Sequence, residues 1–184
     1  NSIQIEDHGR GIPLGYNEKE EKYNWELVFC ELYAGGKYNN NSGDNYEYSL
    51  GLNGLGACAT QYSSEYMDVE VRRDGQIHRL HFEKGENIGG LQSEPTRFKA
   101  TGTKIKWRPD LDVFTDINIP VEYFHNVLKK QAIVNKGLLL KFKNEVSRGQ
   151  FEETEYVYEN GIVDYVKEVS NETAMTDVKY IECE

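Results

Sequence analysis

An eight-residue segment near the start of the chain, Glu6-Asp7-His8-Gly9-Arg10-Gly11-Ile12-Pro13, places the strongest constraint on its fold. Residues 3–6 alternate as a strand does, so Asp7 is expected at the carboxyl end of that strand, where open sheets commonly present ligand-binding groups. A carboxylate there can accept a hydrogen bond from the exocyclic amine of a base. The two glycines permit close approach of a flat ligand, and Pro13 stiffens the exit. The segment favours adenine recognition, although taken alone it also fits an acidic turn after an edge strand.

A second glycine cluster, Gly51-Leu52-Asn53-Gly54-Leu55-Gly56, precedes a small-residue stretch with helix potential, residues 57–62. A glycine loop that leads into a helix N-terminus can hold phosphate, because backbone N–H groups and the helix dipole both face the anion. The loop is not a Walker A sequence, and its glycine spacing is the reverse of the dinucleotide-binding fingerprint. It is therefore a candidate phosphate loop of another kind, or a plain flexible loop.

An amphipathic helix is predicted between the two clusters, with Asn24 as its N-cap and Gly35-Gly36 as its end. Its apolar positions follow the spacing of one helical face: Trp25, Val28, Phe29, Leu32 and Tyr33. Lys37 follows the helix end, where it can complement the helix dipole or reach a phosphate. Residues 38–48 are rich in Asn, Ser and Gly, a composition that favours a mobile lid.

A fourth element, Thr101-Gly102-Thr103, opens a predicted strand at residues 105–107. The Thr103 hydroxyl can both donate and accept a hydrogen bond near a base or an ordered water. A threonine in this place is also an ordinary strand residue.

Together the four elements resemble the ATPase domain of the B subunit of bacterial type II topoisomerases, DNA gyrase or topoisomerase IV, within the GHKL superfamily. Residues 7–13 resemble the D-x-G-R-G-I-P adenine motif of that family, and residues 34–38 its A-G-G-K-[FY] segment. Residues 51–56 resemble its G-L-x-G-x-G phosphate loop, and residues 101–103 its T-G-T motif. The match runs in order over residues 3 to about 145.

The resemblance implies an α+β two-layer sandwich of the Bergerat type, in which a mixed sheet carries helices on one face. Residues 1–184 would form a single domain that lacks the N-terminal arm and first helix of the family. The implied cofactors are ATP and Mg²⁺.

The resemblance also assigns site residues. Asp7 would bind the adenine amino group, and Thr103 and the Gly11 region would complete the contacts through water. The phosphates would meet Lys37 and the backbone of Leu52, Asn53, Gly54, Leu55 and Gly56. The pocket wall and rim, where aminocoumarin-type inhibitors compete with ATP, would comprise Arg10, Ile12, Pro13, Val28, Ile105 and Arg79.

Some positions depart from the family pattern. Glu47 stands where the family usually has lysine, and a carboxylate beside a polyphosphate is unfavourable. Leu50 and Asn53 replace a common glycine and histidine. The catalytic glutamate and the magnesium-binding asparagine of the family are inferred to lie upstream of Asn1, so no catalytic or metal-binding residue is assigned within the chain. We therefore expect this chain alone to bind adenine nucleotides weakly without hydrolysing them.

In the full-length protein, the resemblance implies that ATP binding and hydrolysis drive DNA strand passage and supercoiling by a homodimer that works with an A-type subunit. The net charge of −10 argues against DNA binding by this segment, so DNA contact is assigned to other domains. Gyrase and topoisomerase IV are not separated by these residues. Two alternatives stay open: another superfamily ATPase, such as a mismatch-repair protein, and a nucleotide-binding module that switches shape without hydrolysis.

Composition predicts a cytoplasmic protein. No apolar run reaches membrane length and no signal peptide is evident. The three cysteines share no metal spacing, which favours free thiols in a reducing compartment.

The remaining residues are interpreted as scaffold. Asp74-Gly75 predicts a tight hairpin turn, Pro120 predicts a helix start, and residues 85–102 are interpreted as a connection. The predicted strands cover residues 67–71, 77–83, 138–143 and 154–158, and the predicted helices cover residues 121–136 and 161–168.

Overall fold

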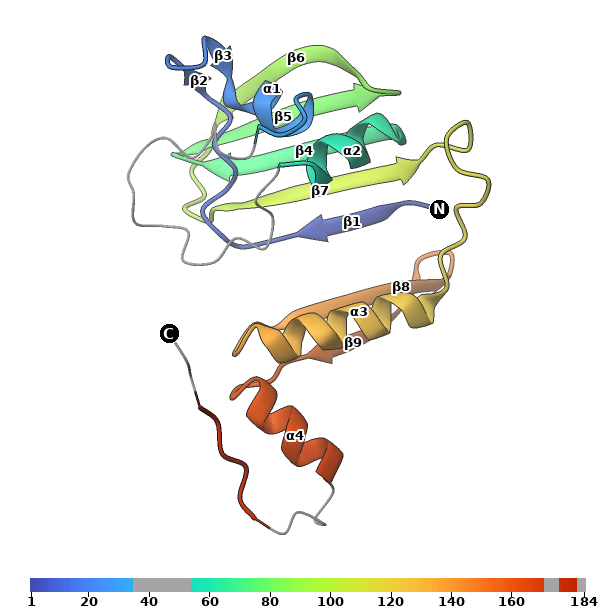
Figure 1. Cartoon of the computed structure of the whole chain (residues 1–184). Coiled ribbons are helices and arrows are strands. Elements are labelled where there is room, and N and C mark those ends of the chain that lie inside the picture. The colour runs from blue at the N-terminus through green and yellow to red at the C-terminus, as the bar shows by residue number, and fades with distance from the viewer. Residues whose placement is uncertain (35–53, 171–175, 182–184) are drawn as a thin grey trace. The chain divides into compact units, whose positions relative to one another are not determined.

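The computed structural model describes residues 1–34, 54–170 and 176–181 of the chain. It divides into two compact units, an N-terminal unit of Asn1–Asn118 and a C-terminal unit of Ile119–Glu184 (Figure 1). The single domain expected from the sequence stays a prediction. None of the helices described is long and apolar enough to cross a membrane.

The N-terminal unit is built on a five-stranded sheet in the order β1-β7-β4-β5-β6. Its strands are β1 Ile3–Glu6, β4 Ser64–Arg73, β5 Gln76–Glu83, β6 Glu86–Pro95 and β7 Gly102–Pro109. Every strand pair in the described residues is antiparallel, so the α+β class is confirmed while the expected mixed sheet is not. The hairpin between β4 and β5 turns at Asp74-Gly75, where both residues have positive φ, as a two-residue type I′ turn requires.

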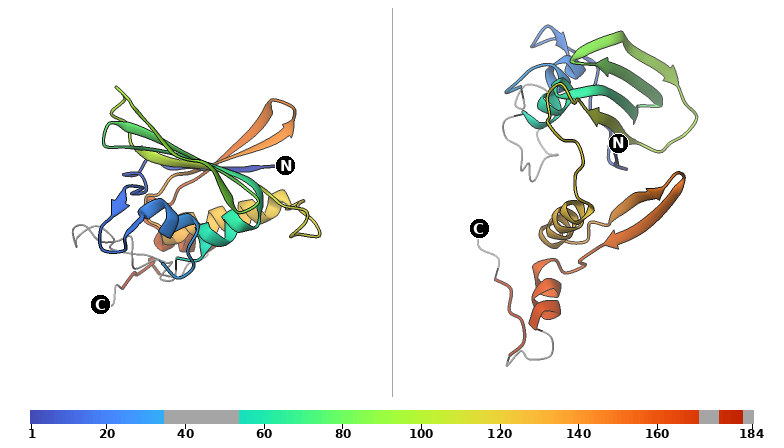
Figure 2. Two further views of the ribbon diagram at one scale, coloured as in Figure 1. Left: turned by 90° about the horizontal axis from the view of Figure 1, so that it is seen from above. Right: turned by 90° about the vertical axis from the view of Figure 1, so that its right-hand side faces the viewer.

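Two helices, α1 Asn24–Phe29 and α2 Gly56–Tyr62, cover one face of this sheet (Figure 2). A short hairpin of β2 Tyr16–Asn17 and β3 Lys22–Tyr23 precedes α1. Side chains alternate along β4, so Met67, Val69 and Val71 enter the core while the residues between them lie on the other face. The core also contains Leu14, Val28, Phe29, Leu80 and Phe82.

The helix expected up to Gly35 ends early, at Phe29. Leu32 and Tyr33, which continue the apolar spacing, are 54% and 70% exposed, so no core contact holds them in a helix. Tyr33 also has a positive φ of 62°. The N-cap is Tyr23 rather than Asn24, because the Glu26 carboxylate accepts the Tyr23 N–H at 2.8 Å in a capping box.

The connection expected over residues 85–102 contains strand β6 instead. Gly89 and Gly90, interpreted from the sequence as loop residues, have positive φ within this strand. They lie where the pairing register between β5 and β6 shifts, between Arg79 and His81. The two glycines therefore form a bulge in an edge strand.

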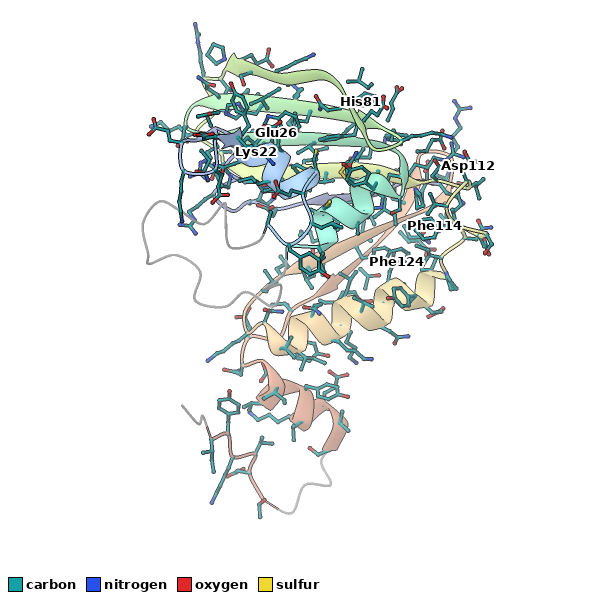
Figure 3. All side chains as sticks on the ribbon, turned by 45° about the horizontal axis from the view of Figure 1, so that its top comes forward. Lys22, Glu26, His81, Asp112, Phe114 and Phe124 are labelled. Carbon is teal, nitrogen blue, oxygen red and sulfur yellow. The ribbon has the colours of Figure 1, made fainter. Side chains whose placement is uncertain are left out.

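The C-terminal unit contains α3 Val121–Val134, the antiparallel hairpin β8 Leu140–Ser147 and β9 Gln150–Tyr156, and α4 Ile162–Ser170. The predicted helices and strands of this region are thus confirmed with shifted bounds, and α3 begins directly after Pro120. Phe124, which is labelled on α3 in Figure 3, stacks on Phe142 of β8 with ring centroids 5.6 Å apart.

Candidate nucleotide-binding site

Asp7 follows β1 directly and is fixed by three backbone hydrogen bonds. Its N–H donates to the Thr103 carbonyl at 2.8 Å. Its Oδ1 accepts the N–H of Gly9 at 2.8 Å and the N–H of Thr103 at 3.3 Å. Within the described residues Oδ2 has no protein hydrogen-bond donor, and Asp7 is exposed. One carboxylate oxygen therefore sets the orientation and the other remains able to accept a bond from a ligand.

Two glycines allow the backbone to pack closely around Asp7. Gly102 opens β7 with φ +149°, and a Cβ at this position would lie 2.1 Å from the Asp7 carbonyl oxygen. Gly11 has φ +79°, and its Cβ would lie 2.9 Å from the Arg72 carbonyl oxygen. Neither position has room for a side chain, which explains the glycines in both motifs.

Thr103 joins the strand end to the glycine turn. Its side chain is buried, and its Oγ1 accepts the N–H of Ile12 at 3.2 Å. The hydroxyl proton is not used in that bond, so Thr103 can still donate to a ligand or a water. Asp7, Gly11, Ile12 and Thr103, which the sequence placed in one site, are thus held together by direct contacts.

Besides Arg10 within the turn, Arg73 of β4 contacts the glycine turn: its Nη1 donates to the Gly11 carbonyl at 2.7 Å. Arg79, predicted at the pocket rim, lies on β5 and pairs with Glu70 at 3.2 Å and Glu94 at 2.5 Å. Its neighbour Leu80 enters the core, so Arg79 lies on the opposite face of the sheet.

The prediction that Arg79 lies at the pocket rim is therefore corrected: the arginine in that position is Arg73. The hydrogen bond with Glu94 is the main reason that the pKa of Arg79 is raised. Sequence reasoning missed Arg73, because strand alternation alone does not say which arginine of the β4–β5 hairpin faces the glycine turn. The register places Arg72 opposite Gly102, so the next residue, Arg73, lies at the sheet end that carries the site.

The apolar wall residues lie on the helix side of the sheet. Val28 belongs to the buried core cluster, and Ile12 and Ile105 pack against that cluster while remaining partly accessible. Pro13 is half-buried and Arg10 is exposed. The structure thus brings Ile12, Val28 and Ile105 to one cluster.

The phosphate-loop prediction is only partly covered by the described residues. Gly54 has φ +62°, Leu55 is the N-cap of α2, and Gly56 is its first residue. No side chain caps this helix start. Lys37, Glu47, Leu50, Leu52, Asn53 and the predicted lid of residues 38–48 lie outside the described residues.

Metal-ligand clusters and cysteines were the other candidate features in the described residues. No group of three or more His, Cys, Asp or Glu side chains in that part of the chain could hold a metal ion. Cys30 and Cys58 are free thiols. Burial raises the pKa of the Cys30 thiol to about 11, with the nearby Cys58 and Glu26 adding to the shift, so this thiol stays protonated and unreactive at neutral pH.

Curated relatives of the chain are B subunits of type II topoisomerases. The B subunit of topoisomerase IV from Salmonella typhimurium is 36% identical over 171 residues, which are 92% of this chain and 26% of that protein. The B subunit of DNA gyrase from Halalkalibacterium halodurans is 37% identical over 172 residues, with the same coverage. The chain thus spans about a quarter of the length of these relatives. A comparison with models of protein families finds no match.

Solved structures give the same assignment. The 43K ATPase domain of Thermus thermophilus gyrase B, in complex with an aminocoumarin, has a TM-score of 0.74 and 26% identity, and the match covers 92% of this chain and 41% of that one. The topoisomerase IV ATP-binding domain of Francisella tularensis, in complex with a small-molecule inhibitor, has a TM-score of 0.71 and 27% identity, and the match covers 91% and 43%. By sequence and by fold, the chain belongs to the family of ATPase domains found in the B subunits of DNA gyrase and topoisomerase IV.

Proposed function

We propose that this chain binds the adenine of ATP at Asp7 and serves as part of the nucleotide-binding domain of a gyrase-like type II topoisomerase. The observation that carries the proposal is the Asp7 carboxylate, fixed through Oδ1 and open at Oδ2. An accepting oxygen in this position suits the exocyclic amine of adenine. The relatives, and the aminocoumarin and inhibitor complexes of the structural neighbours, support the same assignment.

Three groups of this chain would act together on the base. Asp7 Oδ2 accepts a hydrogen bond from the amino group, and the Thr103 hydroxyl donates to a ring nitrogen or to a water bound beside it. Ile12, Val28 and Ile105 form the apolar wall against which a flat base packs. Specificity for adenine would follow because a keto group in place of the amine would put an acceptor opposite the carboxylate.

Phosphate binding by Gly54, Leu55 and Gly56, together with Lys37, Leu52 and Asn53, is proposed from the family motif. A bound Mg²⁺ would neutralise charge on the phosphates. The described residues show no cluster that could hold a metal ion, so the Mg²⁺ proposal is supported by the family motif alone.

We propose further that the full-length protein couples ATP binding and hydrolysis to DNA strand passage and supercoiling in the cytoplasm. It would act as a homodimer with an A-type subunit, and DNA contact would come from other domains because this chain carries a net charge of −10. Support for this proposal comes from the gyrase and topoisomerase IV relatives.

Calorimetric titration with a non-hydrolysable ATP analogue tests the role of Asp7. Asp7→Asn should weaken binding by about 1.5 to 3 kcal/mol, the scale of a hydrogen bond to a charged group. Asp68→Asn is the matched control, because Asp68 pairs with His81 on the other face of the sheet. Equal affinity of the Asp7→Asn and Asp68→Asn variants would remove adenine recognition from Asp7.

A second titration, with an aminocoumarin, tests whether Arg73 lies at the pocket rim. Arg73→Ala should lower inhibitor affinity, because Arg73 contacts the Gly11 carbonyl at the turn. Arg79→Ala should leave affinity unchanged, because Arg79 is held by Glu70 and Glu94 on the opposite face. If Arg79→Ala lowers inhibitor affinity and Arg73→Ala does not, then Arg79 lies at the pocket rim.

A further inference from the structure

Gln61 on α2 is buried in the N-terminal unit without the hydrogen bonds that its side-chain amide can make. It is 1% exposed, and both its Nε2 and its Oε1 are buried without a hydrogen-bond partner in the described part of the chain. A primary amide has two donors and an acceptor oxygen, and burying them unpaired is unfavourable. The other buried atom without a hydrogen bond there, Arg108 Nε, lies 3.2 Å from Glu65 Oε2 and so has an ionic partner.

The hydroxyl side chains on and just after α2 find partners within the same segment. Thr60 Oγ1 donates to the Gly56 carbonyl at 2.8 Å, and Ser63 Oγ donates to the Ala59 carbonyl at 2.7 Å. Ser64 Oγ donates to the Thr60 carbonyl at 2.6 Å. These short hydroxyl side chains reach carbonyls one turn back, whereas the longer Gln61 amide has no partner within the helix or beyond it in the described residues. The unpaired state is thus specific to Gln61.

The two ends of α2 are held differently. At the C-terminal end, the Asp110 N–H donates to the Ser63 carbonyl at 3.0 Å, and Tyr62 packs so closely on Gly85 that a Cβ there would lie 2.8 Å from the ring. At the N-terminal end, Leu55 supplies no side-chain cap and Gly54 has a positive φ. A shift of α2 would therefore be largest at its N-terminal end, while Cys58 keeps the helix anchored in the core.

We propose that Gln61 is a positioning residue that couples α2 to the phosphate loop. In this view α2 has a second position in which the Gln61 amide is hydrogen-bonded, and the phosphates of ATP on Gly54, Leu55 and Gly56 favour that position. The unpaired amide raises the free energy of the described position of α2. ATP therefore needs a smaller difference in affinity between the two positions to shift α2 to the second one. The inference rests on the proposed function, because the ligand that shifts α2 is a triphosphate.

Gln61→Met is the test, because methionine has a similar volume and no amide. Without nucleotide, the variant should have a higher Tm than the wild-type chain, since the unpaired amide is gone. Its affinity for a non-hydrolysable ATP analogue should fall about tenfold, within the usual range of coupling between linked sites. Its affinity for adenosine, which carries no phosphate, should be unchanged. Gln92→Met, an exposed position on β6, should alter none of the three values.

A lower Tm for Gln61→Met, together with an unchanged ratio of ATP-analogue to adenosine affinity, would overturn the proposal. It would show that the amide already has hydrogen-bond partners where it lies, for example a trapped water.

If the variant does not fold, ¹⁵N-glutamine NMR on the wild-type chain decides. The Gln61 side-chain NH₂ should shift and exchange more slowly on addition of the ATP analogue and not of adenosine, and an unchanged signal overturns the proposal. A wild-type chain that binds neither ligand would contradict the proposed function and this inference with it, whereas normal binding with an unchanged ratio removes the inference alone.

Discussion

The two units of the chain are stabilised by different means. In the N-terminal unit, Phe82 lies 5.8 Å from Phe29 and 6.3 Å from Trp25 between ring centroids, inside a continuous apolar cluster. In the C-terminal unit, Ala132 and Ile133 are the only buried apolar side chains among the described residues. The N-terminal unit therefore has a core of its own, and the C-terminal unit has little more than one contact layer.

Polar and aromatic pairs take the place of a core in the C-terminal unit. Lys141 pairs with Glu155 and Lys143 with Glu153 across the β8–β9 hairpin, both at 2.6 Å. Helix α4 has no buried residue and is tied to α3 by Lys129 and Glu168 at 2.7 Å. Exposed ion pairs contribute little to stability and weaken with salt. The N-terminal unit, which carries the site, should therefore resist changes that loosen the C-terminal unit.

The greatest loss of stability should come from truncating Phe82 in the core of the N-terminal unit, with truncation of Phe142 in the C-terminal unit as the comparison. Phe82→Ala should lower the unfolding free energy of the N-terminal unit by about 3 to 5 kcal/mol, because it leaves a cavity in a packed core. Phe142→Ala, in the unit without a core, should cost clearly less. Urea denaturation followed by tryptophan fluorescence measures the loss in the N-terminal unit, which contains Trp25 and Trp107, and circular dichroism measures the loss in the C-terminal unit. Equal losses would mean that the C-terminal unit has a core of comparable quality.

The next effect is at the site. Gly102→Ala should cost about 3 kcal/mol, since overpacking against a backbone atom adds to an unfavourable positive φ. Nucleotide binding should fall with it, because the added Cβ collides with the carbonyl of Asp7. Gly75→Ala is the matched control: it also has positive φ but nothing lies within 4 Å, so about 1 kcal/mol of strain is expected without loss of binding. Similar losses for both variants would show that φ alone matters at Gly102.

A smaller effect is a pH dependence of the N-terminal unit. Hydrogen bonds with Asp68 and then Glu83 raise the pKa of His81 above its usual 6.5. A raised pKa means that the stabilisation is fully present below the pKa of the unfolded chain and is lost as pH rises through the higher folded value. The denaturation midpoint should therefore fall as pH rises above about 6.5, and His81→Gln should flatten this dependence. A wild-type midpoint that rises over this range would contradict the assignment.

The weakest effect concerns α4. Glu168→Gln should speed hydrogen exchange in α4 at low salt, because it removes the charge that faces Lys129. At high salt the variant and the wild-type chain should converge, since the pair is screened. Hydrogen exchange in β4 should be the same in the variant and the wild-type chain at either salt concentration. Faster exchange throughout the N-terminal unit of the variant would show that the two units unfold together.

Local features of the fold followed from the sequence because their causes are local. The Asp74-Gly75 turn, the start of α3 after Pro120 and the place of Asp7 at the end of β1 depend on dihedral preference and short spacing. The same reasoning overestimated α1, because the apolar spacing of Leu32 and Tyr33 says nothing about whether a partner surface exists. It also assigned Gly89 and Gly90 to a connection, because a bulge is visible only against its partner strand.

The resemblance to the family motifs predicted that Asp7, the Gly11 turn and Thr103 lie together, and the structure joins them by hydrogen bonds from the Thr103 N–H to Asp7 and from the Ile12 N–H to Thr103. The arginine that joins them could be identified only from the tertiary structure. Arg73 and Arg79 lie on adjacent strands of one hairpin, and strand alternation alone does not say which side faces the glycine turn. That choice is made by the register of β4 against β7 and by the packing of Leu80 into the core, which turns Arg79 to the other face and leaves Arg73 at the strand end beside Gly11.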